Sequence, residues 1–92
     1  MDKKFQDSLL AARREAERLG VRLRPVDGDP LAFAHRCLSG HRESDGFAKL
    51  AELGRLDLTV EALAVKKQFT ALFSDEEANN ALMRLLEAGY KF

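Results

Sequence analysis

One short stretch of this chain gathers its most reactive residue types. HRCLSGHRESDG, residues 35–46, contains both histidines and the only cysteine. These groups are ligands of zinc, which needs three or four donors converging at about 2.0–2.3 Å. His35 and Cys37, however, stand two residues apart in a predicted helix, about 200° apart around its axis. His41 follows Gly40, where that helix should end. We therefore expect no metal at these residues, and no cofactor.

The same stretch could supply a cysteine and histidine pair for nucleophilic catalysis. Such a pair needs a thiol within about 3 Å of a base, in a setting that lowers the thiol pKa. Cys37 adjoins Leu38 on the apolar side of the predicted helix, so burial should raise its pKa instead. The chain also has no glycine-rich loop that could form an oxyanion hole. We predict that it is not an enzyme.

Short helices would have to position these residues. Apolar residues spaced three and four apart predict a helix over residues 5–19 and a second one from Pro30 to Gly40. A short helix should follow over residues 47–53. Three N-terminal caps are expected at Asp29, Thr59 and Ser74, the last in a capping box with Glu77. Gly40 should close the second helix in a left-handed conformation.

The faces of these helices can also be predicted. Leu19 and Leu53 continue the apolar stripes of the first and third helices, so we expect both to be buried. The last helix has the most regular pattern. Its predicted inward residues are Ala78, Ala81, Leu82, Leu85 and Leu86. Its predicted water-facing residues are Asn79, Asn80 and Arg84.

Residues 59–73 do not fit one straight helix. Val60 and Leu63 lie nearly opposite Phe69 and Phe73 on an ideal helix. A chain of 92 residues is too short to bury a helix on all sides. We therefore predict a break near Lys66 and Lys67.

The whole pattern predicts an all-α fold. We expect one domain, residues 1–92, built as a compact bundle of five or six short helices with irregular connections. Residues 21–26 should form at most a minor extended segment, because Pro25 prevents a helix from continuing through them.

The charge and cysteine content limit the class of protein. Fifteen basic and fifteen acidic residues give a formal net charge of zero, so no overall field attracts nucleic acid or anionic lipid. A single cysteine is typical of a reducing compartment. No apolar run approaches the roughly twenty residues of a membrane span, and no signal peptide is evident. We expect a cytoplasmic protein without a membrane anchor.

The favoured hypothesis is a small protein-interaction module, such as an adaptor, inhibitor or self-associating accessory protein of a bacterial or mobile-element kind. Large aromatic residues at a helix junction and a cluster of arginines support it. The predicted partner surface comprises Arg14, Arg18, Arg22, His41, Arg42, Asp45, Phe69 and Phe73. We expect a protein partner of unknown identity and leave self-association open.

The alternative is a nucleic-acid-binding regulator. Residues 47–68 have the outline of a helix-turn-helix, with Gly54 near the turn. A DNA-reading helix usually presents basic or amide side chains on its first face, whereas this one offers Glu61 and alanines. A protein partner is therefore favoured over nucleic acid, and the two hypotheses can be separated by experiment.

Overall fold

The computed structural model describes residues 3–26, 28–40, 43–44 and 46–90. Within these ranges the chain forms helices and no strands, which confirms the predicted all-α fold. The α-helices are α1 (Lys3–Arg18), α2 (Pro30–Ser39), α3 (Phe47–Glu52), α4 (Val60–Ala64) and α5 (Asp75–Glu87). Two 3-10 turns, η1 (Leu56–Leu58) and η2 (Thr70–Leu72), connect them.

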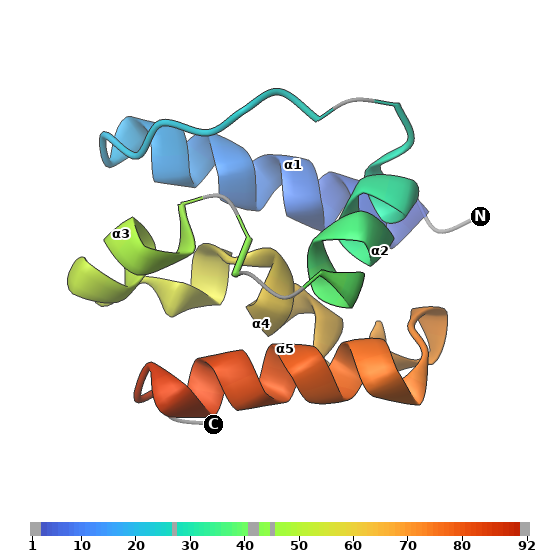
Figure 1. The fold of residues 1–92 in the computed structure, drawn as a ribbon. Helices are drawn as coiled ribbons and strands as arrows, with labels where there is room; N and C mark the ends of the chain where they lie inside the picture. Colours follow the sequence, from blue (N-terminus) through green and yellow to red (C-terminus); the bar gives the residue numbers. More distant parts are fainter. Residues whose placement is uncertain (1–2, 27, 41–42, 45, 91–92) are drawn as a thin grey trace.

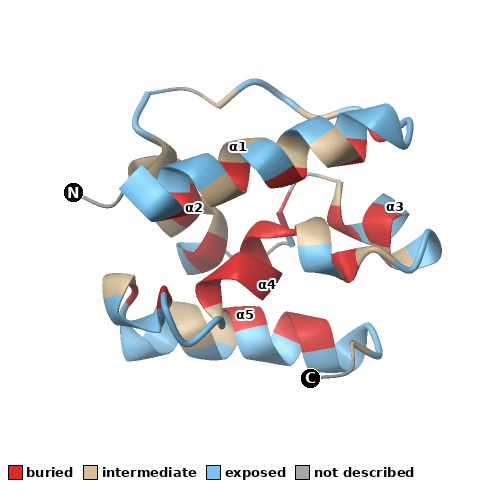
Figure 2. Ribbon diagram, turned by 180° about the vertical axis from the view of Figure 1, so that it is seen from behind, coloured by how far each residue is buried: buried red, intermediate tan, exposed pale blue. Residues whose placement is uncertain are grey.

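Helix α4 is the centre of the bundle. Figure 1 shows α1 along one side and α5 along the other, with α4 between them. Helix α4 contacts α1, α2 and α5, and all of its residues are buried. In Figure 2 the buried residues accordingly concentrate on α4 and on the helix faces turned toward it. A helix this short has little stability of its own, so its neighbours must hold it in place.

The predicted N-terminal caps are confirmed. The Asp29 carboxylate accepts a hydrogen bond from the Ala32 N–H at 3.0 Å, and Pro30 occupies the first turn of α2. The Thr59 hydroxyl accepts from the first turn of α4. Ser74 and Glu77 form the reciprocal capping box at the start of α5. Each cap satisfies backbone N–H groups that the helix itself leaves unpaired.

The predicted C-terminal cap at Gly40 is wrong. Gly40 has φ −81° and ψ 175°, an extended conformation rather than a left-handed one. Its carbonyl oxygen accepts a hydrogen bond from Arg84, and the Leu38 carbonyl accepts one from Asn80 at 2.9 Å. Side chains of α5 therefore satisfy the carbonyl groups that a left-handed glycine turn would otherwise satisfy.

The predicted break in residues 59–73 is confirmed. Helix α4 ends at Ala64, and an irregular turn precedes η2. On a continuous helix, Phe69 and Phe73 would point away from Val60 and Leu63. The turn instead brings both rings into the core. Both rings contact Phe5 of α1, with ring centroids 5.3 and 5.4 Å away in edge-to-face geometry. The segment from Val21 to Val26 forms neither helix nor strand, and Figure 1 shows it running as an extended trace beside α1, in agreement with the prediction.

Four leucines that the pattern placed inside are exposed. Leu19 and Leu53 lie beyond the last turns of α1 and α3, where no neighbouring helix covers them. Leu82 and Leu86 lie on the flank of α5. Successive helical residues turn by about 100°, so the fully buried Ala81 and Leu85 direct their successors away from α4.

Candidate functional site

The predicted partner surface is only partly a surface. Arg14, Arg18 and Arg22 are exposed, and Arg18 makes an ion pair with Glu15 at 3.2 Å. They form a basic edge along the end of α1 and the following extended segment. His41, Arg42 and Asp45 lie outside the described residues.

The assignment of Phe69 and Phe73 to the partner surface is corrected by their burial. Phe69 is 1% exposed and Phe73 is 8% exposed. Together with Phe5 they form an aromatic cluster in the main core. Their apolar area is covered by α1, which the sequence pattern could not place relative to residues 69–73.

His35 and Cys37 have separate environments. His35 lies 2.8 Å, from Nδ1 to Oε2, from Glu77, and its ring is tilted against Phe73. Cys37 is half-buried, and burial raises the pKa of its thiol above the ordinary value of 9.0, as predicted. The described part of the chain contains no cluster of three metal-ligating side chains. Within the described residues, His35 and Cys37 therefore do not belong to one cluster of candidate metal ligands.

The most unusual polar feature is a carboxylate in the centre of the bundle. Glu61 of α4 is fully buried. It accepts hydrogen bonds from the Ser44 N–H at 2.8 Å and from the Ser44 hydroxyl at 2.6 Å. Arg84 of α5 donates to the same carboxylate at 3.1 Å and forms its ion pair. This network joins α4 and α5 to the connection that precedes α3.

Arg84 also binds the end of α2. Its guanidinium donates to the carbonyl oxygens of Cys37, at 3.0 Å, and of Gly40. Among the described residues, every buried side-chain nitrogen or oxygen has a hydrogen-bond partner. The network therefore has no unpaired group that is directed toward a substrate, and its geometry is that of a structural clamp.

The sequence pattern does not reveal this network. It predicts that Arg84 faces water, and it places Glu61 only on the first face of a possible DNA-reading helix. A signal was present. Arg84 follows Ala81 by three residues, so it lies on the same inward side of α5 as Ala81. A charged residue on such a face predicts a buried partner.

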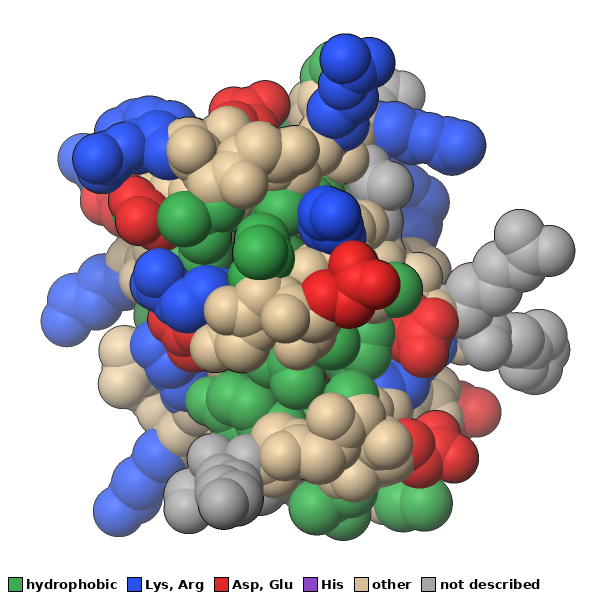
Figure 3. All heavy atoms as spheres, turned by 90° about the vertical axis from the view of Figure 1, so that its left-hand side faces the viewer, with side chains coloured by type: hydrophobic (Ala, Val, Ile, Leu, Met, Phe, Trp, Pro, Cys, Tyr) green, Lys and Arg blue, Asp and Glu red, His purple; other side chains and the backbone are tan. Residues whose placement is uncertain are grey.

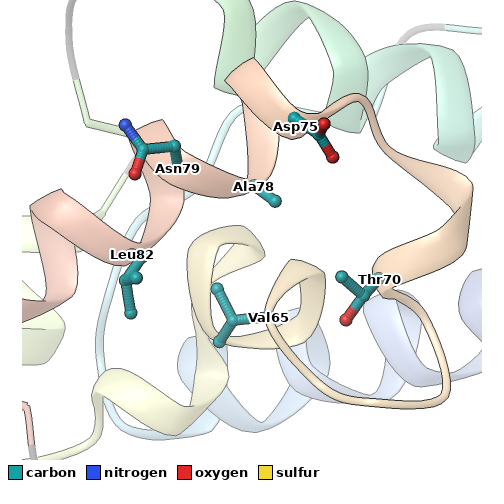
Figure 4. A pocket seen from close by; sticks show the side chains of 6 residues that line it. All are labelled: Val65, Thr70, Asp75, Ala78, Asn79 and Leu82. Atoms are coloured by element: carbon teal, nitrogen blue, oxygen red, sulfur yellow. The ribbon is translucent and has the colours of Figure 1, made fainter.

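A groove runs along α5 on the opposite side from α2. It has a volume of about 400 Å³ and is lined by Val65, Thr70, Asp75, Ala78, Asn79 and Leu82. Figure 4 shows Ala78 and Leu82 of α5 directed toward Val65, with Thr70 and Asp75 at one end. Asp75 is the single titratable group in this lining. The groove thus offers apolar contact and lacks the paired acid and base groups of a hydrolytic site.

An apolar ridge continues along α5 from the end of this groove, with Leu82 shared by both. It consists of Leu82, Met83 and Leu86, which are 36%, 49% and 51% exposed. Hydrophobic side chains also project from the lower edge of the face in Figure 3, where α5 lies. A ridge next to an apolar groove is a surface that another protein chain can contact.

Glu77 gives a pH-dependent prediction. Burial raises the pKa of its carboxyl group, but hydrogen bonds from Ser74 and His35 outweigh that effect and lower the pKa below the ordinary 4.5. A lowered folded-state pKa contributes stability above pH 4.5 that is lost as the pH falls through the folded value.

We therefore expect Glu77→Gln to reduce the free energy of unfolding by about 1 kcal/mol at pH 7, because a charged hydrogen-bond acceptor is lost. The difference from the unchanged protein should shrink steadily below pH 4.5. Urea unfolding at several pH values measures it. A difference that stays constant down to pH 3 would contradict the role of the ionised carboxylate.

Comparison with protein families, with characterised proteins and with solved structures finds no match to this chain. None of the described helices is both long enough and apolar enough to cross a membrane.

Proposed function

We propose that this chain is a small protein-interaction module whose docking surface is the ridge and groove of α5. The observation that carries the proposal is the adjacency of three exposed apolar side chains, Leu82, Met83 and Leu86, to an apolar groove on the same helix. Both would bury apolar surface against a bound partner. Removing apolar surface from water favours association.

The proposed role is non-catalytic and cytoplasmic, and the bonding of the buried polar groups supports its non-catalytic part. The buried polar groups, Glu61, Ser44 and Arg84, are bound to one another and to the backbone. The half-buried thiol of Cys37 has a raised pKa, which reduces the fraction of reactive thiolate. These residues support the fold and leave binding as the activity of the surface.

The nucleic-acid alternative would need a surface other than the helix-turn-helix region. All residues of α4 are buried, so this helix has no face free to enter a DNA groove. The basic edge of Arg14, Arg18 and Arg22 is the available substitute, and Glu15 and Glu17 interrupt it. This edge is tested below as the competing surface.

Three immobilised forms of the protein test the proposal in extract from its native cells. They are the unchanged chain, a ridge variant with Leu82→Ser and Leu86→Ser, and an edge variant with Arg14→Glu and Arg18→Glu. We expect the unchanged chain and the edge variant to retain the same protein, and the ridge variant to lose it at least tenfold. Circular dichroism and thermal unfolding must show that all three are folded.

Electrophoretic mobility shift with mixed single- and double-stranded DNA at low salt completes the comparison. Micromolar DNA binding that is abolished in the edge variant and falls steeply with salt would overturn the proposal in favour of the regulator. Equal retention of proteins by the ridge variant and the unchanged chain would also contradict it.

A further inference from the structure

We propose that the partner that docks on α5 is a basic amphipathic helix of another protein, with lysines or arginines beside its apolar face. The inference rests on the proposed function and specifies the chemistry of the partner. In the proposed complex, the apolar face of this helix covers the groove and the ridge. Its cations lie against the exposed carboxylates of α5.

The groove and the ridge form one continuous apolar strip along α5. The groove follows the helix from Asp75 to Leu82, and the ridge continues from Leu82 to Leu86. At about 1.5 Å per residue, this strip is roughly 17 Å long. A partner helix of about three turns matches that length, with apolar residues three and four positions apart that contact the strip.

The described part of the chain favours a helix over the other common shapes of a bound peptide. Its residues form no strand whose edge could pair with an added strand. The described residues that line the groove include no aromatic ring on which a proline-rich peptide could pack. An apolar groove beside a helix instead accommodates the apolar face of an amphipathic helix.

The exposed charges of α5 are all negative. Asp75 and Glu76 lie in its first turn, Glu87 lies in its last turn, and all three are exposed. Glu76 and Glu87 are separated by close to three full turns, so they lie on the same side of α5, roughly 17 Å apart, with Met83 between them. Figure 3 shows acidic side chains beside the hydrophobic ones at the lower edge of its face.

No described lysine, arginine or histidine forms an ion pair with Asp75, Glu76 or Glu87. The basic residue within α5, Arg84, is buried and bound to Glu61. The strip is therefore accompanied by carboxylates that are open to a partner. Such charges repel nucleic acid and anionic lipid, and they attract a cationic partner.

Helix stability accounts for two of these charges but not for the third. Carboxylates in the first turn, such as Asp75 and Glu76, stabilise a helix through its dipole. Glu87 lies in the last turn, where the dipole disfavours a negative charge. A lysine or arginine of the partner helix would compensate this charge.

Two labelled synthetic peptides test the inference with the purified full-length chain. Both are helices of about 16 residues with the same leucine face, and the positions beside that face carry lysine in one peptide and glutamate in the other. Fluorescence anisotropy should give the lysine peptide a dissociation constant on the order of 10 to 100 µM, and the glutamate peptide at least about tenfold weaker binding. The ridge variant should bind the lysine peptide about tenfold more weakly than the unchanged chain.

Charge reversal tests the carboxylates independently of the leucines. Glu76→Lys with Glu87→Lys should reverse the preference, so that the glutamate peptide binds more tightly than the lysine peptide. The matched control is Glu17→Lys with Glu52→Lys, which makes the same change in net charge at exposed carboxylates of α1 and α3. This control should retain the preference for the lysine peptide, and circular dichroism must show that both variants are folded.

Three results would overturn the inference: no binding of the lysine peptide at about 1 mM, equal binding of the two peptides, or the same effect of both charge reversals. If one of them occurs while the ridge variant still loses a protein from native extract, the basic helix is rejected as the partner and the interaction module stands. If the ridge variant retains that protein, the proposed function itself fails.

Discussion

Replacing Arg84 with methionine is expected to lower the free energy of unfolding by about 3 to 5 kcal/mol. Methionine is of similar length and apolar, so it largely fills the space of the arginine stem. It removes the positive charge beside the fully buried carboxylate of Glu61 and the donors to the carbonyls of Cys37 and Gly40. An uncompensated charge in the centre of the bundle accounts for most of the loss.

The matched control is Arg18→Met, which removes the same charge from the exposed ion pair with Glu15. Exposed ion pairs contribute about 0 to 1 kcal/mol, so this variant should be nearly neutral. Urea unfolding at neutral pH gives both values. If the two losses are equal, Glu61 is not held by Arg84 in the way described.

Glu61→Leu combined with Arg84→Met extends the test. Without the buried carboxylate, the double variant should be more stable than Arg84→Met alone, although Ser44 and the α2 carbonyls lose partners. In the Arg84→Met background, Glu61→Leu should thus raise the free energy of unfolding. Two independent packing losses would add, so this opposite effect distinguishes a charge pair from simple packing.

The local signals in the sequence predicted local structure well. Asp29, Thr59 and Ser74 cap their helices because a side-chain oxygen within three residues of the free N–H groups is all that a cap requires. The break after Ala64 was equally predictable, since the two apolar faces on either side of Lys66 and Lys67 conflict on one straight helix.

Features that depend on distant neighbours were not predictable in this way. The periodicity of α5 places Leu82 and Leu85 on one broad apolar stripe, but which edge of the stripe meets α4 depends on how the helices cross. For the same reason, the sequence pattern predicts a solvent-facing Arg84 and includes Phe69 in the partner surface. The groove of α5 could not be predicted at all, since the residues of its far wall, Val65 and Thr70, lie outside α5.

The aromatic cluster supplies the second large expected effect. Phe69 is 1% exposed, and its ring meets Phe5 edge to face at 5.3 Å. Phe69→Ala removes a fully buried ring between α1 and the turn before η2, and the surrounding helices cannot close the resulting cavity. We expect the free energy of unfolding to fall by about 3 to 5 kcal/mol.

Phe33→Ala provides the comparison for Phe69→Ala. Phe33 is only partly buried, at the edge of the same cluster, where the Arg13 guanidinium lies 5.1 Å from its ring centre. Its removal should cost less than half as much, because the lost ring leaves an open surface depression and no closed cavity.

Urea unfolding of both variants decides between core and surface for Phe69. A loss below about 0.5 kcal/mol, the range of surface substitutions, would return Phe69 to the partner surface that the sequence first suggested. A loss several times larger than that of Phe33→Ala would mean that residues 69–73 fix α1 against α4, which leaves the ridge of α5 as the apolar surface available to a second chain.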